Sequence, residues 1–340
     1  MSAQTKVWHQ KSNHKVYIVM FYYHRADWGI LAFTDSDRLR YLHNQSTNDF
    51  NSLTPGEGCL TVFVTSTART IDLALAYVTE DRVLVIVAPQ RREKLLKWLD
   101  GFIFPFDKVK LQDATDDFSL ITLVGEATDT VVTQLLGSYS NDGQEHSHQL
   151  GEIDSIPIRV AKGNDLALPG YNLIVPREQA DTICQELAKQ NLQQLSDREW
   201  EDLRITQGRP MPDHELTEDY NPLEAGLWQT ISFDKGCYIG QETIARLNTY
   251  NGVKQQLWGV KLDKAVTPET PVTLDEKKIG VFTSYTETAN GLFGLAYVKT
   301  KAGGAGLTVK IGDATGELVD VPFVSTGLEV KISDNKNDLI

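Results

Sequence analysis

Cysteine is scarce in this chain of 340 residues, and the few cysteines are scattered. Only Cys59, Cys184 and Cys237 occur, and no two of them form a CxxC pair. A disulfide framework needs an even, closely spaced set of cysteines, and an all-cysteine zinc site needs several paired sulfur ligands, so both are excluded. We therefore predict a protein of a reducing compartment, the cytoplasm, without a metal site.

Basic charge is also in short supply. Lys and Arg together number 33 against 46 for Asp and Glu, which gives a formal net charge of −13. Proteins that bind nucleic acid normally carry a basic footprint, so we predict no nucleic-acid partner. A local basic pocket for an anionic small molecule remains compatible with an acidic chain.

Long hydrophobic runs are missing as well. The longest run near the start, residues 16–23, is short and rich in aromatic residues. A helix needs about 20 apolar residues to span a bilayer. No small-residue cleavage site follows the run, so it does not resemble a signal peptide. We predict no membrane partner.

What is present in the first three quarters of the chain is a mixture of strand and helix patterns. Ser196 followed by Glu199 forms a capping-box pattern at the start of one helix. The apolar periodicities predict strands over 60–66, 71–78, 82–88, 109–111, 119–125, 156–160 and 171–175, and helices over 37–50, 91–100, 130–136, 177–190, 196–205 and 242–248. This mixture predicts an α+β fold.

The pattern changes after about residue 252. Short apolar runs then alternate with Gly, Asp, Thr and Asn at fairly regular spacing. Such spacing is typical of a small all-β barrel or sandwich. We predict one region over 1–252 and a C-terminal β domain over 253–340.

Two histidines lie close together in a polar segment. His146 and His148 alternate as residues of a strand do, and imidazole is a common metal ligand. No third ligand is evident, so we predict two solvated histidines in a loop.

The most informative stretch surrounds Cys237. Lys235 lies two residues before it, and Gly236 and Gly240 permit tight turns. A thiol becomes a useful nucleophile as a thiolate, which a nearby cation or a helix N-terminus favours. The alternative is a buried structural cysteine in a glycine-rich turn, since free cysteine is among the most buried residue types.

The residues after this cysteine predict a helix over 242–248. Cys237 therefore lies shortly before a helix start, where backbone N–H groups are free. Arg246 follows Glu242 by one helical turn, so the two side chains can form an ion pair.

This stretch resembles the signature K-G-C-[YF]-x-G-Q-E-x-x-x-R of the YgfZ family, which are folate-binding relatives of the glycine-cleavage aminomethyltransferase. The matching residues are Lys235, Gly236, Cys237, Tyr238, Gly240, Gln241, Glu242 and Arg246. Arg38 with residues 41–49 resembles the N-terminal segment of the family, and residues 221–227 resemble the segment before the cysteine motif.

The resemblance implies a GcvT-like fold, in which mixed α/β subdomains and a C-terminal β-barrel surround a central channel that holds tetrahydrofolate. It implies a role in the assembly or repair of iron–sulfur clusters in client enzymes, with folate and these iron–sulfur proteins as partners. Cys237 would be the functional thiol, and Lys235 would lower its pKa. Arg246 would position the loop or meet the carboxylates of folate.

The same resemblance suggests folate contacts, each with a structural alternative. Asp72 either binds the pterin, lies on the surface of an edge strand or bonds to a nearby turn. Tyr171 either stacks on the pterin or packs in the core. Arg204 either meets the glutamate tail of folate or pairs with Glu201 or another nearby acid. Gln45 and Asn48 either bind the ligand or cap a helix end.

Two departures from the aminomethyltransferases argue against aminomethyl transfer. Those enzymes carry two adjacent aspartates where this chain has Asp72 and Leu73. They also carry a pterin-reading glutamate where this chain has Thr206, which cannot make the same bidentate contact. A one-carbon transferase and a non-catalytic scaffold remain the alternative functions.

Overall fold

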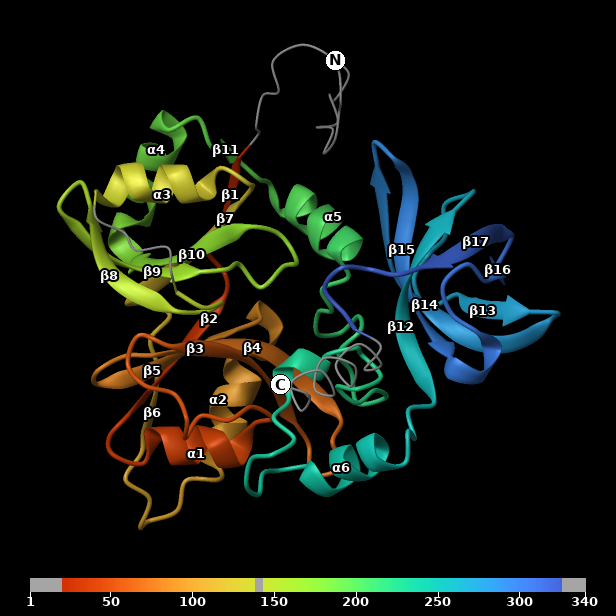
Figure 1. Ribbon diagram of the computed structural model, residues 1–340, viewed down its shortest axis with the longest axis horizontal. Coiled ribbons are helices and arrows are strands. Elements are labelled where there is room, and N and C mark those ends of the chain that lie inside the picture. Colours follow the sequence, from red (N-terminus) through yellow and green to blue (C-terminus); the bar gives the residue numbers. More distant parts are fainter. Residues whose placement is uncertain (1–19, 138–142, 326–340) are drawn as a thin grey trace, which may run out of the picture.

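The structure, a computed structural model, describes residues 20–137 and 143–325. It consists of two β-sheets with helices packed on them and one β-barrel. Figure 1 shows the two sheets one above the other, with the barrel beside them. The predicted α+β architecture and the C-terminal β-barrel are therefore confirmed.

The first sheet has five strands in the order β3-β4-β5-β2-β6. Its central strand β4 is buried along its whole length, because helices cover one face of the sheet and the second sheet covers the other. The elements of this layer are β2 (Gly29–Thr34), α1 (Arg38–Gln45), β3 (Gly58–Val64), β4 (Thr70–Val78), β5 (Arg82–Val87), η1 (Pro89–Arg91), α2 (Arg92–Asp100) and β6 (Lys110–Asp113).

The second sheet has six strands in the order β11-β1-β7-β10-β9-β8. The described chain begins in this sheet with β1, leaves for the first sheet and returns with β7, so the two layers interleave in sequence. Its elements are β1 (Phe21–Arg25), β7 (Phe118–Val124), α3 (Thr128–Leu136), β8 (His148–Ile153), β9 (Ile156–Lys162), β10 (Gly170–Pro176), η2 (Arg177–Gln179), α4 (Ala180–Lys189) and β11 (Gln193–Gln194).

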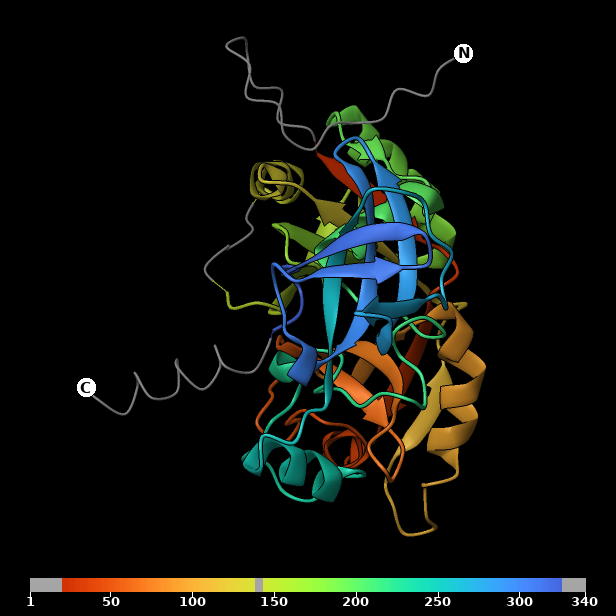
Figure 2. The ribbon, with the colours of Figure 1, turned by 90° about the vertical axis from the view of Figure 1, so that its right-hand side faces the viewer.

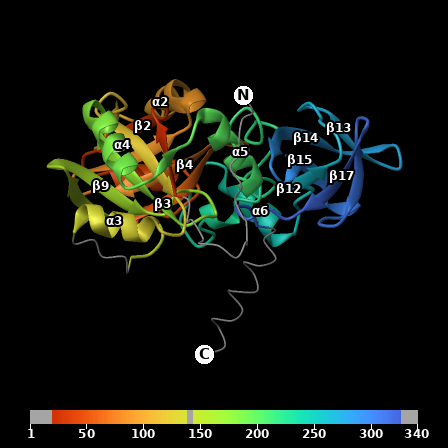
Figure 3. The same cartoon turned by 90° about the horizontal axis from the view of Figure 1, so that it is seen from above.

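A long connection leads from the sheets to the barrel. It holds α5 (Asp197–Gln207), η3 (Trp228–Thr230) and α6 (Gln241–Thr249). The capping box predicted at Ser196 and Glu199 is present at the start of α5. Seen from above, α5 lies between the sheets and the barrel (Figure 3).

The barrel closes on itself in the strand order β12-β15-β14-β13-β16-β17. Figure 2 shows this barrel facing the viewer. A register shift between Phe282 and Ser284 bends β14, as bulges do in closed barrels. Its elements are β12 (Gln255–Leu262), β13 (Pro271–Leu274), β14 (Lys277–Thr288), β15 (Gly291–Lys299), η4 (Thr300–Ala302), β16 (Thr308–Ile311) and β17 (Ala314–Val319).

A buried polar joint fastens the barrel to the rest of the molecule. The Glu215 carboxylate is fully buried and accepts hydrogen bonds from Thr283 Oγ1 at 2.7 Å and Ser284 Oγ at 2.6 Å, both on β14. Arg204 on α5 completes the joint, because its Nη1 lies 2.8 Å from Glu215 Oε2. Tyr297 of β15 adds a hydrogen bond from its hydroxyl to the Glu215 carbonyl at 2.9 Å.

Three expectations about local structure are wrong. The helix predicted over 37–50 ends at Gln45, and the chain then runs as a loop to β3. His148 is not solvated: it lies on β8, only 6% exposed, with Nε2 facing the Glu57 carbonyl at 3.1 Å. His146 is half-buried, and its buried Nδ1 makes no hydrogen bond to any residue that the structure describes. Both histidines lie where β8 meets the end of the first sheet, which is why they are shielded from water.

No helix in the described ranges is long and apolar enough to cross a membrane. The apolar run at residues 16–23 lies partly outside the described residues, and its last three residues begin the buried strand β1.

Candidate functional site

Asp72 is a buried carboxyl group with one unsatisfied oxygen. It lies on β4 and is fully buried, and its Oδ2 accepts a hydrogen bond from the Ala88 backbone N–H at 2.9 Å. Its Oδ1 makes no hydrogen bond to any described residue. Burial raises the pKa of the Asp72 carboxyl to about 7. The alternative of a surface aspartate on an edge strand is wrong, because β4 is an interior strand of its sheet. The alternative of a bond to a nearby turn matches the contact of Oδ2 with Ala88, the residue before η1.

Two arginines act on this carboxyl group. The charges of Arg209 and Arg91 oppose the effect of burial on the pKa of Asp72. Arg91 is held in place by Asp213, which lies 2.6 Å from its Nη2, and by the Ile71 carbonyl, which lies 2.9 Å from its Nε. A buried, partly unsatisfied carboxyl next to fixed cations is the kind of group that a polar ligand can engage.

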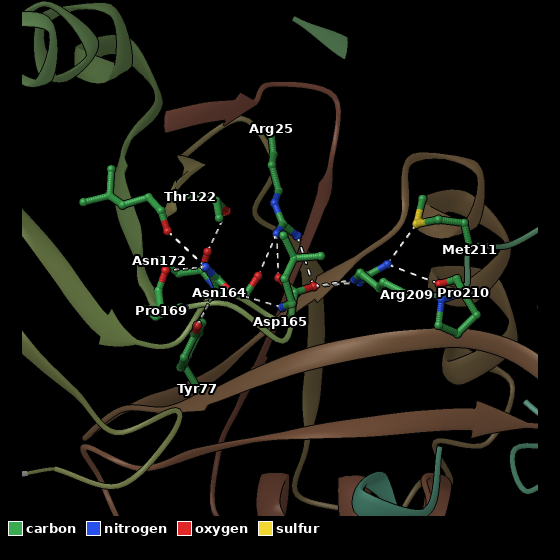
Figure 4. A network of polar contacts seen from close by, with 12 residues as sticks. Arg25, Tyr77, Thr122, Asn164, Asp165, Pro169, Asn172, Arg209, Pro210 and Met211 are labelled. Carbon is green, nitrogen blue, oxygen red and sulfur yellow. Dashed lines mark hydrogen bonds and ion pairs between the residues drawn. The ribbon is translucent and has the colours of Figure 1, made fainter. Parts of the chain in front are cut away.

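A second buried carboxylate fixes Arg209. Asp165 lies between two guanidinium groups: Arg25 Nη2 is 2.5 Å from its Oδ1, and Arg209 Nε is 2.9 Å from its Oδ2 (Figure 4). Arg25 also lies between the rings of Trp28 and Trp200, 4.4 Å from each centroid. Burial acts to raise the pKa of Asp165, but the two arginines outweigh it and lower the pKa.

The same close-up shows a chain of side-chain hydrogen bonds between the two sheets. Thr122 Oγ1 donates to Asn172 Oδ1 at 2.6 Å, and Asn172 Nδ2 donates to the Tyr77 hydroxyl at 3.1 Å (Figure 4). Tyr77 belongs to the first sheet and the other two belong to the second. Buried networks of this kind hold their members in one geometry.

The Cys237 thiol belongs to a different region, a surface loop before α6. Cys237 is exposed, whereas Cys59 and Cys184 are buried. The alternative of a buried structural cysteine is therefore wrong for Cys237. Exposure makes this thiol accessible to a partner or a substrate.

Lys235 anchors this loop. Its side chain is buried, and Nζ donates to three backbone carbonyls at the end of α1: those of His43, Ser46 and Asn48. An ammonium group has three N–H donors, so none remains for a thiolate. Burial lowers the pKa of Lys235 to about 8. Lys235 therefore stabilises the C-terminal end of α1, where the helix dipole favours a cation.

The rest of the motif shapes the loop. The Lys235 Nζ lies over the ring of Tyr238, 4.7 Å from the ring centroid. The Tyr238 backbone N–H donates to Gln241 Oε1 at 3.4 Å. Gly240 has a φ of 83°, and a Cβ there would lie 2.9 Å from the Thr65 carbonyl oxygen, so only glycine fits. Gly236 is exposed and immediately precedes the thiol.

The ion pair expected within α6 does not form. Glu242 and Arg246 are both exposed, and no ion pair joins them in the part of the chain that the structure describes. An exposed pair gains little Coulomb energy and must offset the ordering of two long side chains.

Two of the proposed folate contacts lie in packed positions. Tyr171 is fully buried in the second sheet, and its hydroxyl donates to Asp129 Oδ1 at 2.6 Å. Arg204 is fully buried and pairs with Glu201 as well as Glu215. For both residues the structural alternative is the one that the geometry favours.

Gln45 and Asn48 lie beside the motif loop. Asn48 uses its side chain locally, because Nδ2 donates to the Leu60 carbonyl at 2.7 Å and Oδ1 accepts from the Asp49 N–H at 2.8 Å. Gln45 Oε1 is buried and accepts no hydrogen bond within the described part of the chain. Gln45 therefore keeps a free acceptor, whereas Asn48 stabilises the turn.

The predicted site residues thus form two groups. No hydrogen bond or ion pair in the described ranges joins Cys237 to Asp72. The sequence analysis missed the cations around Asp72 and the pair formed by His43 and Asp49 beside Gly236. His43 and Asp49 are only six residues apart, so their closeness in the sequence was a usable signal. Arg25 and Asp165 are 140 positions apart, and nothing in the sequence marks them as a pair. Within the same described ranges, no cluster of three or more His, Cys, Asp or Glu side chains is arranged to hold a metal ion.

Comparisons with known proteins agree on one family. The family model described as the GCVT N-terminal domain matches residues 29–235. A protein of Arabidopsis thaliana named as a chloroplastic transferase is 41% identical over 305 residues, which cover 88% of this chain and 70% of that protein. The aminomethyltransferase of Chlorobium chlorochromatii is 26% identical over 260 residues, covering 74% of this chain and 70% of the enzyme.

A solved structure shows the same fold. The glycine cleavage system aminomethyltransferase T from Bartonella henselae superposes with a TM-score of 0.78 at 16% identity, over 91% of this chain and 87% of that one. The expected fold of mixed α/β sheets with a closed C-terminal barrel is confirmed by this likeness.

Proposed function

Because the chain belongs to the family of the GCVT N-terminal domain, whose model spans residues 29–235, we propose that it binds tetrahydrofolate or a derivative. We further propose that it acts as YgfZ-like proteins do, supporting the assembly or repair of iron–sulfur clusters in client enzymes through the Cys237 thiol. The central channel and a cytoplasmic location belong to the same proposal, although the relative from Arabidopsis thaliana is named as chloroplastic.

The observation that carries folate binding is the unsatisfied oxygen of Asp72. A pterin ring offers N–H donors, and a buried carboxylate oxygen without a partner is a matching acceptor. Arg209 and Arg91 lie close enough to act on the same carboxyl group and favour its ionised form. The residues present therefore fit the proposed cofactor at this point.

The observation that supports a thiol function is the contrast among the three cysteines. Burial raises the pKa of Cys59 to about 12 and that of Cys184 to about 11, so neither thiol ionises near neutral pH. Cys237 alone is exposed, on a loop that is anchored at Lys235. A loop built in this way presents a thiol to a partner in a fixed place.

Aminomethyl or one-carbon transfer is the second candidate, and the names of the relatives favour it. Two residues weigh against it. Leu73, at the position of the second aspartate, is buried in the apolar cluster shared by both sheets. Thr206 turns its hydroxyl back to the carbonyls of Asp202 and Leu203 within α5. Leu73 therefore offers no carboxylate, and the Thr206 hydroxyl is used within α5.

Calorimetric titration with reduced tetrahydrofolate under anaerobic conditions tests the first part. We expect saturable one-site binding of micromolar strength, on the order of −8 kcal/mol. At about pH 8, where the Asp72 carboxyl is mainly ionised, Asp72→Asn should weaken binding about tenfold or more, since it replaces a charged acceptor by a neutral amide. Asp313→Asn, on an exposed turn, is the control. Absence of binding to the wild-type protein would overturn the proposal.

Activity of iron–sulfur enzymes tests the second part. In a host without its own copy, the wild-type chain should restore these activities and Cys237→Ala should not. Cys184→Ala is the matched control, because it removes a buried thiol. Full support by Cys237→Ala would exclude the thiol role, and formation of a folate product with an aminomethyl donor would favour the transferase. Lack of both folate binding and any Cys237 phenotype would favour a scaffold.

A further inference from the structure

A buried histidine lies against the motif loop. His43 belongs to the last turn of α1, and its side chain is only 8% exposed. Its Nδ1 lies 2.9 Å from Asp49 Oδ1. This contact fixes the orientation of the ring, because Asp49 is itself held by the backbone N–H of Asn51 at 2.9 Å and of Ser52 at 3.4 Å.

The other ring nitrogen faces the residue before the thiol. A Cβ placed on Gly236 would lie 3.7 Å from His43 Nε2. Nε2 makes no hydrogen bond to any described residue, and Gly236 is bonded directly to exposed Cys237. Gly236 thus lies next to an imidazole nitrogen that no described residue engages, and the thiol is carried by the residue bonded to Gly236.

The protonation state of the ring suits a base. Burial lowers the pKa of His43, and the charge of Lys235 lowers it further, while Asp49 acts to raise it. Burial acts to raise the pKa of Asp49, but hydrogen bonds from Asn51 and Ser52 and the contact with His43 outweigh it and lower that pKa. An ionised Asp49 accepts the Nδ1 proton, which leaves Nε2 as the acceptor of a neutral ring.

Lys235 does not take this role. Its three N–H groups are occupied by the carbonyls at the end of α1, so it influences the thiol only through its charge. His43 is therefore the group in this region with a free proton-accepting atom beside Gly236.

We propose that His43, oriented by Asp49, is the proton acceptor for the Cys237 thiol. This inference rests on the thiol function proposed above and adds to it the residues that activate the thiol. The Cys237 S–H bond breaks, the proton passes to His43 Nε2 directly or through one water molecule, and the electron pair stays on sulfur as a thiolate. The thiolate then attacks an electrophilic partner, and His43 returns the proton to the leaving group.

Alkylation of the full chain by iodoacetamide tests this proposal without any client. Sulfur forms a bond to the methylene carbon as iodide leaves, and the thiol proton goes to His43. Cys237 is the exposed cysteine, and Cys237→Ser gives the background from Cys59 and Cys184. We expect His43→Gln to slow alkylation near neutral pH about tenfold and to remove the contribution of the imidazole from the pH–rate profile.

Asp49→Asn should slow alkylation less than His43→Gln, because it leaves the ring in place but loosens its orientation. His214→Gln, which alters an exposed histidine, should change nothing. Circular dichroism confirms that each variant is folded. Superimposable pH profiles for wild type, His43→Gln and Asp49→Asn would overturn the inference. Folate titration of the same variants separates this failure from a failure of folate binding, because alkylation requires no folate.

Discussion

At the scale of single residues, Asp72 shows what burial does to a carboxyl group. In the unfolded chain its pKa lies near 3.8, and in the folded protein burial raises the pKa to about 7. Across that range the folded state keeps a proton that the unfolded state has lost. The stability that the protonated group contributes is complete at acidic pH and is lost as pH rises toward 7.

Asp72→Asn should remove this pH dependence, because the amide is neutral at every pH and can still accept from the Ala88 N–H. Relative to wild type, the free energy of unfolding of the variant should rise by about 2 kcal/mol from about pH 5.5 to about pH 8. Urea titrations at the two pH values measure the difference, with Asp313→Asn as the exposed control. If the free energies of unfolding of variant and wild type differ by the same amount at both pH values, the Asp72 carboxyl is already ionised in the folded protein at the lower pH.

Lys235 is a second residue whose effect is read from its contacts. Lys235→Met keeps the aliphatic length but leaves three carbonyls at the end of α1 without their donor. We expect a loss of about 3 kcal/mol in the free energy of unfolding. Lys97→Met, on the exposed face of α2, should change it by less than about 0.5 kcal/mol. Equal effects of the two substitutions in denaturant titrations would refute the anchoring role.

At the scale of elements, the start of α6 depends on one glycine. Gly240→Ala meets both an unfavourable φ of 83° and the Thr65 carbonyl oxygen at 2.9 Å. Gly137→Ala, after α3, meets a comparable φ of 69° with no atom of a described residue within 4 Å. We expect a loss of about 1 kcal/mol at Gly137 and about 3 kcal/mol at Gly240 in thermal or urea unfolding. A similar cost at both positions would mean that strain alone matters and that the packing of α6 against the β3–β4 turn does not.

Elements with a strong local pattern were predictable, and elements that depend on distant partners were not. The strand over 82–88 and the helix over 91–100 carry clear periodicities, and the structure has β5 and α2 there. The strands β1 and β2 were missed, because β1 pairs with β7 and β11, both far along the chain. The strand β8 is mostly polar and half-exposed, so its sequence is that of a loop.

At the scale of the whole molecule, the joint around Glu215 determines how firmly the barrel is held. Glu215→Gln removes the charge that Arg204 requires and places an N–H donor among other donors. We expect the free energy of unfolding to fall by about 3 kcal/mol, as when one partner of a buried ion pair is lost. Glu218→Gln breaks the exposed ion pair with Lys94 and should change the free energy of unfolding by less than about 1 kcal/mol. A small effect of Glu215→Gln on urea unfolding would show that apolar packing alone holds the barrel.

The candidate site illustrates the same limit on prediction at larger scale. The motif from Lys235 to Arg246 is contiguous, so its resemblance was visible in the sequence. Arg209 and Asp165 come together only when a loop of the second sheet meets the segment after α5, and no local pattern marks such a meeting. The contacts of Lys235 were hidden from the sequence for the same reason, since its three acceptors lie at and just after the end of α1, 187 to 192 positions earlier.

The loop that carries Cys237 is tied at both ends. Lys235 is fixed to the end of α1, and the Ile239 N–H donates to the Asn44 carbonyl at 3.0 Å. Only a few residues lie between these ties, so the sulfur can swing through a small arc but cannot travel. Chemistry that needs a carrier arm, in which a group is picked up at one place and delivered at another, is ruled out for this thiol by its short tether. Any molecule that exchanges a group with Cys237 must bring its own reacting atom to the surface beside α1 and α6.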